Sequence, residues 1–334
     1  MFKNILVTGG AGYCGSLLTP QLLDAGYNVT VYDILYFGDS FLPKDNPRLK
    51  IIQGDIRDAS KLATALKGQD AVLSLACISN DASFELDERL STTVNLDAFE
   101  PMVIAAKKAG VKRFAYASSS SVYGVSDKPD VTEDHPLVPL TLYNKYKGMC
   151  EPLLFKHTDE NFTGVAFRPA TVCGYAPRLR LDLSVNILTN HALTNNKITV
   201  FGGSQLRPNL HIQDYVDLCK LLLTAPTEKI ANQIFNCGYQ NMTIMDIAHL
   251  VKKVVEQEFP EKAPIEIVTT PSDDNRSYHI NSDKIRKVLG FTPKHTIEEA
   301  VCDLCRAFRE GKITDSFTND RYYNVRTLKK LKAA

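Results

Sequence analysis

The hydrophobic residues in the first half of the chain gather in short continuous runs, with amphipathic segments between them. Such runs are typical of strands that are covered on both faces of a sheet. They predict strands at 4–8, 28–33, 49–55, 70–76, 113–119 and 163–170. Helical periodicity fills the intervals, around 17–26, 60–68, 95–110 and 142–158. Alternating strands and helices predict an α/β fold with a doubly wound parallel sheet.

After residue 170 this rhythm breaks. The chain continues as a loop rich in arginine and proline, YAPRLRLD, and one short strand, ITVF. Helical patterns follow the loop and the strand, near 183–195, 214–224, 243–259 and 296–309. Segments this irregular predict a smaller mixed α/β region on the carboxyl-terminal side, which covers the edge of the sheet and binds the substrate.

The first predicted strand runs directly into a glycine-rich loop, TGGAGYCG (8–15), which opens a helix. Gly9 permits the tight turn, Gly12 lets the backbone approach a pyrophosphate, and Gly15 lets the helix approach the sheet. The position of the loop between a first strand and a first helix therefore predicts dinucleotide binding.

The loop also divides the chain. We expect residues 1–172 to form a Rossmann-like NAD-binding domain, to which 209–238 returns. The remaining residues, 173–208 and 239–334, are expected to form the substrate-binding region.

Asp33 ends the second strand, where a carboxylate holds both hydroxyls of the adenine ribose and repels a 2′-phosphate, which favours NAD over NADP. A solvated carboxylate at the end of a strand is the alternative. Asp55 follows the third strand and is expected near the adenine, although a plain turn carboxylate explains its position nearly as well.

The other predicted cofactor contacts are Tyr13, Cys14, Ile56, Leu75, Ala76, Tyr143 and Lys147. A thiol at a helix amino terminus tends to have a lowered pKa, but we expect Cys14 to have a packing role.

Tyr143 and Lys147 lie four residues apart in a predicted helix and therefore share one face. A tyrosine ordinarily titrates near pH ~10, so it needs a close cation to act as a base near neutrality. Lys147 and the charge of an oxidised nicotinamide would stabilise the phenolate. By itself this spacing is equally compatible with a structural role.

The glycine loop, Asp55, the LAC segment (75–77), SSSSVYG (118–124) and YNKYK (143–147) together resemble the extended short-chain dehydrogenase/reductase family. The similarity covers nearly the whole chain and is greatest to sugar-nucleotide epimerases and dehydratases, such as the UDP-glucose 4-epimerase group. The resemblance implies a catalytic triad of Ser119, Tyr143 and Lys147. In that family the serine hydrogen-bonds the reacting sugar hydroxyl and the tyrosine takes its proton. Hydride then passes from carbon to the nicotinamide and leaves a 4-keto sugar.

Two departures from the family bear on the reaction and the substrate. Its dehydratases carry Asp-Glu directly after the triad serine or threonine, whereas this chain has Ser120 and Ser121, which disfavours elimination of water. Its epimerases carry an asparagine where this chain has Thr171, so the resemblance does not determine the identity of the sugar. The resemblance implies substrate contacts from Ser119, Ser120 and Thr171.

The resemblance also implies a diphosphate clamp made by Arg207 and Arg276, since a guanidinium donates bidentately to phosphate oxygens. Either arginine could instead form a surface ion pair. The segment RLRLDLSVN (178–186) resembles a loop of bacterial enzymes that oxidise GDP-linked heptoses for surface polysaccharides. That similarity adds Arg180 and Asn186 to the predicted substrate contacts.

The same triad serves two kinds of reaction. The first hypothesis is an NAD-dependent sugar-nucleotide epimerase that works through a 4-keto intermediate. The alternative is a net-redox 4-dehydrogenase or 4-ketoreductase, acting on a GDP-linked deoxysugar or heptose among other substrates. A non-catalytic NAD sensor or scaffold on the same fold is a third hypothesis, and the intact triad argues against it.

The resemblance also implies an assembly. It implies a homodimer that pairs through the helices within 84–109 and 139–158.

Composition limits the binding partners and the cellular compartment that we expect for this chain. The chain has 334 residues, 44% hydrophobic and 23% charged, with a formal net charge of +1, so neither a nucleic-acid nor a membrane surface is expected. The start of the sequence lacks the pattern of a secretory signal, and the eight cysteines show no disulfide spacing, which together favour the cytoplasm. Cys302 and Cys305 share one face of a predicted helix and are expected in the core, so no metal site is predicted.

Overall fold

The computed structural model describes residues 2–333, except for 127, 129, 273–276 and 278. Its centre is a seven-stranded sheet with the order β10-β6-β5-β4-β1-β2-β3, in which every neighbouring pair is parallel. The strands are β1 (Asn4–Thr8), β2 (Asn28–Asp33), β3 (Leu49–Gln53), β4 (Ala71–Ser74), β5 (Arg113–Ala117), β6 (Thr163–Pro169) and β10 (Gln233–Cys237). The predicted doubly wound parallel sheet is therefore confirmed.

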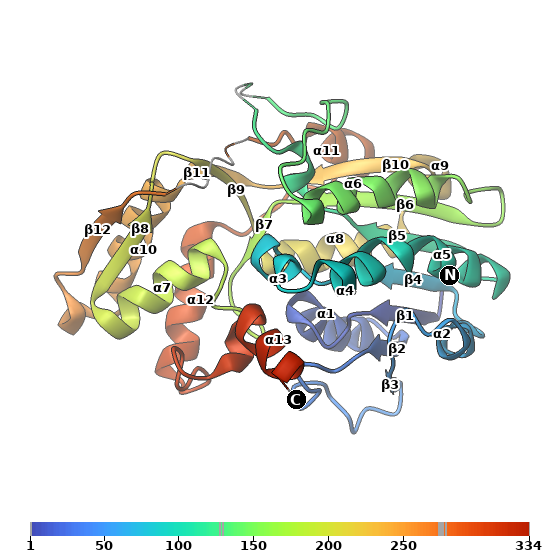
Figure 1. The fold of residues 1–334 in the computed structure, drawn as a ribbon, viewed down its shortest axis with the longest axis horizontal. Coiled ribbons are helices and arrows are strands. Elements are labelled where there is room, and N and C mark those ends of the chain that lie inside the picture. The colour runs from blue at the N-terminus through green and yellow to red at the C-terminus, as the bar shows by residue number, and fades with distance from the viewer. Residues whose placement is uncertain (1, 127, 129, 273–276, 278, 334) are drawn as a thin grey trace.

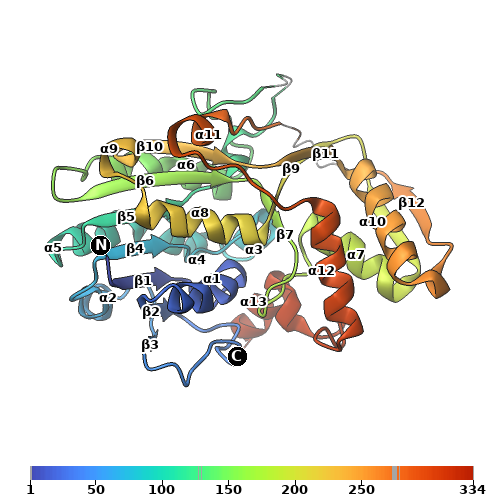
Figure 2. The ribbon, with the colours of Figure 1, turned by 180° about the vertical axis from the view of Figure 1, so that it is seen from behind.

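Helices cover both faces of this sheet (Figures 1 and 2). One face carries α1 (Tyr13–Asp24), α8 (Ile212–Thr224) and α11 (Asp283–Leu289). The other carries α2 (Ala59–Leu66), α5 (Phe99–Lys108) and α6 (Leu142–Phe155). The strands are apolar along their whole length because both faces are buried, as in Phe114 and Phe167, which are fully enclosed.

A second region lies beside the sheet, at the left of Figure 1. It contains the parallel pair β8 (Lys197–Phe201) and β12 (Glu266–Thr270), and the helices α7 (Ser184–Asn195), α10 (Ile244–Glu258) and α12 (Ile297–Arg309). These helices share a separate apolar core, in which Cys305 is buried and Cys302 is partly buried. A three-stranded sheet of β7 (Thr171–Cys173), β9 (Leu206–His211) and β11 (Gln240–Thr243) lies between this region and the large sheet.

The last helix, α13 (Asn324–Ala333), was not predicted and packs near the carboxyl edge of the large sheet (Figure 1). The remaining short elements are α3 (Asp81–Glu85), α4 (Glu88–Thr92), the π-helical turn η1 (Thr93–Asp97), α9 (Thr227–Ile230), and the 3-10 turns η2 (Ser120–Tyr123), η3 (Pro260–Lys262) and η4 (Asp320–Tyr322). No helix within the described ranges has both the length and the apolar composition of a membrane crossing.

The strand order places a crevice at one position of the sheet edge. From β1 the chain proceeds outward to β2 and β3 on one side, and from β4 outward to β5 and β6 on the other. The loops that follow β1 and β4 therefore leave the sheet in opposite directions, and ligands of such sheets bind between them.

Candidate active site

A cavity of about 600 Å³ opens at this crevice. Its lining includes the glycine loop after β1, the ends of β2 and β4, the start of α6, and residues of β7, β9 and α13. Residues separated by more than 300 positions thus border one space. Among the predicted site residues that the structure describes, all except Asn186 line this cavity.

The glycine loop is shaped by close backbone approaches. Gly9 has a φ of +73°, and a Cβ there would lie 2.7 Å from the amide nitrogen of Ala76, after β4. A Cβ on Gly15 would lie 2.5 Å from the carbonyl oxygen of Gly9. A Cβ on Gly12 would meet only that same carbonyl oxygen, at 3.1 Å, and otherwise open space. Gly9 and Gly15 therefore serve the packing of the loop, while Gly12 leaves its cavity side open for a ligand.

Two carboxylates follow the next strands. Burial raises the pKa of Asp33, although its oxygens accept backbone N–H groups from Ala11 at 3.0 Å and Leu35 at 2.8 Å. Burial also opposes the ionisation of Asp55, but hydrogen bonds from Arg57 outweigh it and lower the pKa of that carboxyl group. Asp33 thus presents a buried acceptor at the cavity wall, and Asp55 is an ion-paired turn residue at its edge.

Tyr13 and Cys14 occupy the first turn of α1. The hydroxyl of Tyr13 donates to the carbonyl oxygen of Gly174 at 2.6 Å, so this buried ring links the loop to the segment after β7. Burial raises the pKa of Cys14 to about 12, which overturns the lowered value expected at a helix start. Cys14 is consequently a neutral thiol that packs between two apolar clusters while bordering the cavity. The apolar residues Ile56, Leu75 and Ala76 complete this wall.

The predicted triad comes from β5 and α6. Ser119 follows the end of β5, with its hydroxyl 2.7 Å from that of Ser121, which donates to Asn144 at 2.6 Å. Tyr143 lies in the first turn of α6, and Lys147 lies one turn later. The Lys147 ammonium group is buried and donates to the carbonyl oxygen of Ala117 at 2.7 Å. Ser119, Tyr143 and Lys147 all line the cavity, so a phenol, an ammonium group and a hydroxyl group share one space.

An ion pair that the sequence did not indicate holds α6 against the sheet. Arg168 of β6 donates to both carboxylate oxygens of Glu151 in α6, at 2.9 and 2.6 Å, and Ser118 donates to the same carboxylate at 2.7 Å. Burial alone would lower the pKa of Arg168, but its bonds to Glu151 raise it. Both side chains are almost fully buried, so α6 and its tyrosine are held against the sheet.

The substrate-side predictions divide into three groups. Ser120, Thr171 and Arg207 line the cavity, with Ser120 and Arg207 largely buried. Arg276 lies outside the described residues. Asn186 is fully buried and bonds the amide of Gly174 at 2.9 Å and the carbonyl of Arg180 at 2.8 Å. Its predicted contact with substrate is corrected here, because its side chain is occupied in holding the loop that carries Arg180.

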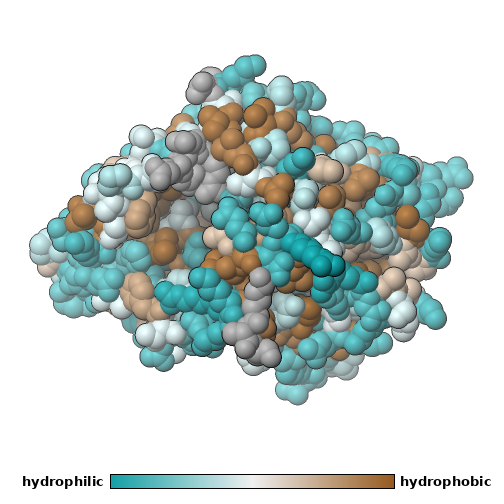
Figure 3. All heavy atoms as spheres, viewed as in Figure 1, coloured by the Kyte–Doolittle hydropathy of each residue, from teal (hydrophilic) through white to brown (hydrophobic). Residues whose placement is uncertain are grey.

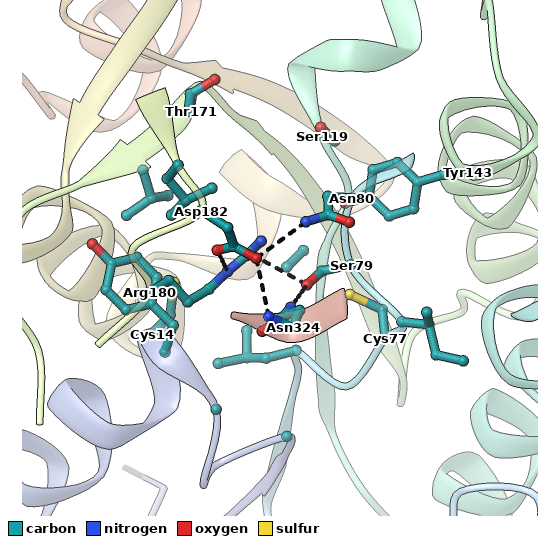
Figure 4. Close-up of a pocket in the computed structure, with 18 of the residues that line it drawn as sticks. Cys14, Cys77, Ser79, Asn80, Ser119, Tyr143, Thr171, Arg180, Asp182 and Asn324 are labelled. Carbon is teal, nitrogen blue, oxygen red and sulfur yellow. Dashed lines mark hydrogen bonds and ion pairs between the residues drawn. The ribbon is translucent and has the colours of Figure 1, made fainter. Parts of the chain in front are cut away.

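Arg180 belongs to a polar network that crosses the cavity (Figure 4). Its guanidinium group donates to Asp182 at 2.8 Å and to Ser79 at 3.2 Å, while Asp182 accepts from the backbone of Asn324 at 3.1 Å. Burial alone would lower the pKa of Arg180, but Asp182 raises it. The sequence indicated Arg180 through the arginine-rich segment YAPRLRLD. No local motif indicates Ser79 or Asn324 as members of the network.

The residues present suit a bound NAD. Gly12 leaves room for a phosphate group at the start of α1, and Asp33 offers ribose hydroxyls an acceptor whose negative charge disfavours a 2′-phosphate. Lys147, whose buried ammonium group donates to the carbonyl oxygen of Ala117, lines the same cavity.

Comparisons with known proteins agree with this geometry. The chain is 29% identical over 316 residues to UDP-glucose 4-epimerase of Lactobacillus helveticus, covering 87% of this chain and 92% of the relative. It is 27% identical to dTDP-glucose 4,6-dehydratase of Streptomyces griseus, covering 88% and 90%.

Solved structures give the same result. The structure of Thermotoga maritima UDP-glucose 4-epimerase with UDP-glucose matches with a TM-score of 0.82 at 25% identity, covering 92% and 99% of the two chains. MoeE5 in complex with UDP-glucuronic acid and NAD matches with a TM-score of 0.80 at 26% identity, with the same coverage. The sequence profile of the NAD dependent epimerase/dehydratase family matches residues 5–238. This chain therefore belongs to the NAD-dependent epimerase/dehydratase family and is an NAD-dependent enzyme of the epimerase and oxidoreductase kind.

Proposed function

We propose that this enzyme is a sugar-nucleotide epimerase that acts at C4 of the sugar through a 4-keto intermediate. The observation that carries the proposal is the shared cavity, in which Ser119, Tyr143 and Lys147 border the same space as the dinucleotide loop. Several relatives of the chain carry the name 4-epimerase and are named for UDP-linked sugars, such as the UDP-glucose 4-epimerase of Lactobacillus helveticus.

In this mechanism Tyr143 removes the proton of the sugar hydroxyl at C4, and Ser119 hydrogen-bonds the same oxygen. Lys147 favours the phenolate because its ammonium charge is held one turn away on the same face of α6. Bound NAD supplies the acceptor for the hydride that leaves C4 and later returns it. Arg207, on β9, is placed to bind the diphosphate of the substrate.

Elimination of water is disfavoured in this site. Ser120 and Ser121 occupy the positions after Ser119, and the hydroxyl of Ser121 is bonded to Asn144. The carboxylate of Asp182 also borders the cavity but is paired with Arg180. No general acid therefore stands beside Ser119 in the chain.

A net-redox 4-dehydrogenase or 4-ketoreductase is the second candidate, and the network around Arg180 favours it. The bond from Arg180 to Ser79 joins the segment after β7 to the segment after β4, across the cavity (Figure 4). A 4-keto sugar must turn over before hydride can return to its opposite face, and such a crosslink limits the room for that rotation. GDP-linked deoxysugars and heptoses are substrates to include for this candidate.

The two candidates differ in the fate of the hydride. The purified protein would be unfolded and its bound nucleotide identified by mass spectrometry, and intact protein would be incubated with UDP-, dTDP-, GDP- and CDP-linked sugars. Co-purified NAD together with C4-epimeric products and no growth of NADH absorbance supports the epimerase. NADH that grows in step with substrate consumed contradicts it and supports the dehydrogenase.

Tyr143→Phe tests whether the turnover depends on the proposed base. Tyr146→Phe, on the same helix, is its matched control and should keep its turnover.

We also propose that the enzyme is a cytoplasmic homodimer that contributes to polysaccharide biosynthesis. All eight cysteines are free, which suits a reducing compartment. Apolar side chains are exposed just before α6, at Val138 and Leu140, and in the middle of α6, at Met149. Figure 3 shows apolar residues on this face of the molecule. An apolar surface along α6 suits pairing with a second copy. Light scattering of the native protein and of Met149→Lys tests this assembly.

A further inference from the structure

Arg178 is a buried cation in the wall of the cavity. Only 4% of the residue is exposed, and no carboxylate oxygen in the described part of the chain lies within 4.0 Å of its guanidinium nitrogens. Its Nη2 donates to the side-chain oxygen of Asn324 at 2.5 Å, while its Nε is buried without a hydrogen-bond partner. Burial and the neighbouring Arg180 lower the pKa of Arg178 to about 9. A buried cation in this condition is suited to an anion that the cavity admits.

The position of Arg178 identifies which half of the cavity would supply that anion. Its backbone N–H donates to the hydroxyl of Ser16 at 3.1 Å, in the first turn of α1. Its guanidinium carbon lies 3.6 Å from the centre of the Phe37 ring, which follows β2 and Asp33. These neighbours belong to the dinucleotide loop and the ribose end of the cofactor site. Arg207, by contrast, comes from β9 in the substrate half.

The carboxyl-terminal segment holds this arginine in place. Asn324 begins α13 and bonds three partners from different parts of the chain: Arg178, the carboxylate of Asp182, and the hydroxyl of Ser79, the last at 2.9 Å. The segment is anchored further by the backbone bond from Leu181 to Tyr322 at 3.0 Å. Leu328, one turn into α13, also lines the cavity.

We propose that Arg178 is a phosphate-binding residue for the pyrophosphate of NAD and that Asn324 is its positioning residue, so that the carboxyl-terminal segment forms part of the cofactor site. Arg178 lines the cavity, and its guanidinium group donates to a phosphate oxygen when the cofactor is bound. This assignment is independent of whether the enzyme epimerises or oxidises its sugar. It implies that NAD leaves slowly, because the cofactor is held by both ends of the chain.

The primary test uses the full-length protein, stripped of nucleotide, with Arg178→Met. Methionine keeps most of the apolar contact with Phe37 but removes the charge. NADH binding is measured by fluorescence titration and UDP binding by calorimetry. We expect the Kd for NADH to rise about tenfold or more and the Kd for UDP to change less than about threefold, where tenfold corresponds to about 1.4 kcal/mol.

The unliganded stability separates a binding role from a structural one. Removal of a buried cation that lacks an ion partner is expected to leave the melting temperature of the stripped protein unchanged or raised. Arg113→Met is the matched control, because Arg113 is equally buried but lies outside the cavity and donates to the carbonyl oxygens of Leu222 and Leu223. That control is expected to lower the melting temperature, because the carbonyl oxygens of Leu222 and Leu223 lose their buried donor, and to leave the Kd for NADH unchanged.

Asn324→Asp tests the positioning role. The new carboxylate would pair with Arg178, so the stripped protein should melt at a higher temperature while NADH binds more weakly. A purely structural asparagine would not couple these two changes. Lys329→Ala, at an exposed position of the same helix, is the control and should alter neither.

Two results would overturn the proposal. One is an unchanged Kd for NADH in Arg178→Met and Asn324→Asp. The other is a loss of UDP affinity with NADH affinity retained, which would assign the anion to the substrate diphosphate instead.

Discussion

The two halves of the cavity are built in different ways. The cofactor half consists of loops at the ends of parallel strands, and its Gly9, Gly12, Gly15 and Asp33 lie within one strand-helix-strand unit. The half that we propose for the substrate is assembled from β7, β9 and the loop that carries Arg180. Local sequence therefore specifies the first half, whereas the second exists only when distant segments pack together. Substitutions should accordingly separate cofactor binding, turnover and substrate binding.

The largest effect is expected where the two halves meet. Tyr143→Phe removes the proton acceptor while both binding surfaces stay intact, so kcat should fall by about 10²- to 10⁴-fold. The Kd for NADH should stay within about twofold. Turnover is measured with the nucleotide sugar found active in the panel. Retention of more than about a tenth of wild-type turnover would contradict the assignment of Tyr143 as the base.

Two glycine substitutions should separate the loss of NADH affinity from the loss of stability in the cofactor half. In Gly12→Ala the new methyl group meets only the carbonyl of Gly9, at 3.1 Å, and otherwise points into open space, so the protein should fold but lose about 100-fold in NADH affinity. In Gly15→Ala the methyl group would lie 2.5 Å from that carbonyl oxygen, so stability should fall as well. Thermal melting and NADH titration of both variants give the comparison. Equal melting temperatures for the two would contradict the packing role of Gly15.

In the substrate half, Arg207→Met should weaken the binding of UDP or another nucleoside diphosphate by about tenfold, because one charge-assisted contact is lost. NADH binding should be unaffected, since Arg207 lies on β9. Calorimetric titration with both ligands shows the split. A larger loss for NADH than for the nucleoside diphosphate would place Arg207 in the wrong half.

The smallest effect concerns pH. Ionised Asp33 accepts ribose hydroxyls, and burial raises its pKa above the ordinary aspartate value. NADH affinity should therefore decline severalfold on acidification, beginning at a higher pH than an exposed aspartate would produce. Because the folded-state pKa lies above the unfolded one, protonation of Asp33 favours folding, so this loss is not an unfolding effect of that group. Asp33→Asn should flatten the pH dependence of the NADH titration.

The sequence predicted the large sheet well because its strands and helices carry strong local patterns. The six strands predicted between residues 4 and 170 lie in the sheet, and α1, α2, α5, α6 and α8 lie within a few residues of their patterns. The strand β10 and the helix α11 were not predicted. The α13 helix was missed because its sequence, NVRTLKKLKA, is short and has few large apolar residues. Its place depends on Tyr322 and Tyr323, which precede it and pack with Leu179 and Leu181.

Among the site residues, the sequence by itself determined those that a local motif requires. Gly9 and Gly15 permit close backbone approaches that a side chain would block, and Tyr143 and Lys147 share a helix face through their spacing alone. Only the tertiary structure decided the function of residues whose partners are distant in the chain. It turned Asn186 into a support for the Arg180 loop, kept Cys14 protonated by burial, and brought Asn324 to Arg178. The physical reason is that burial and hydrogen-bond partners belong to the packed fold, whereas residue type and spacing belong to the sequence.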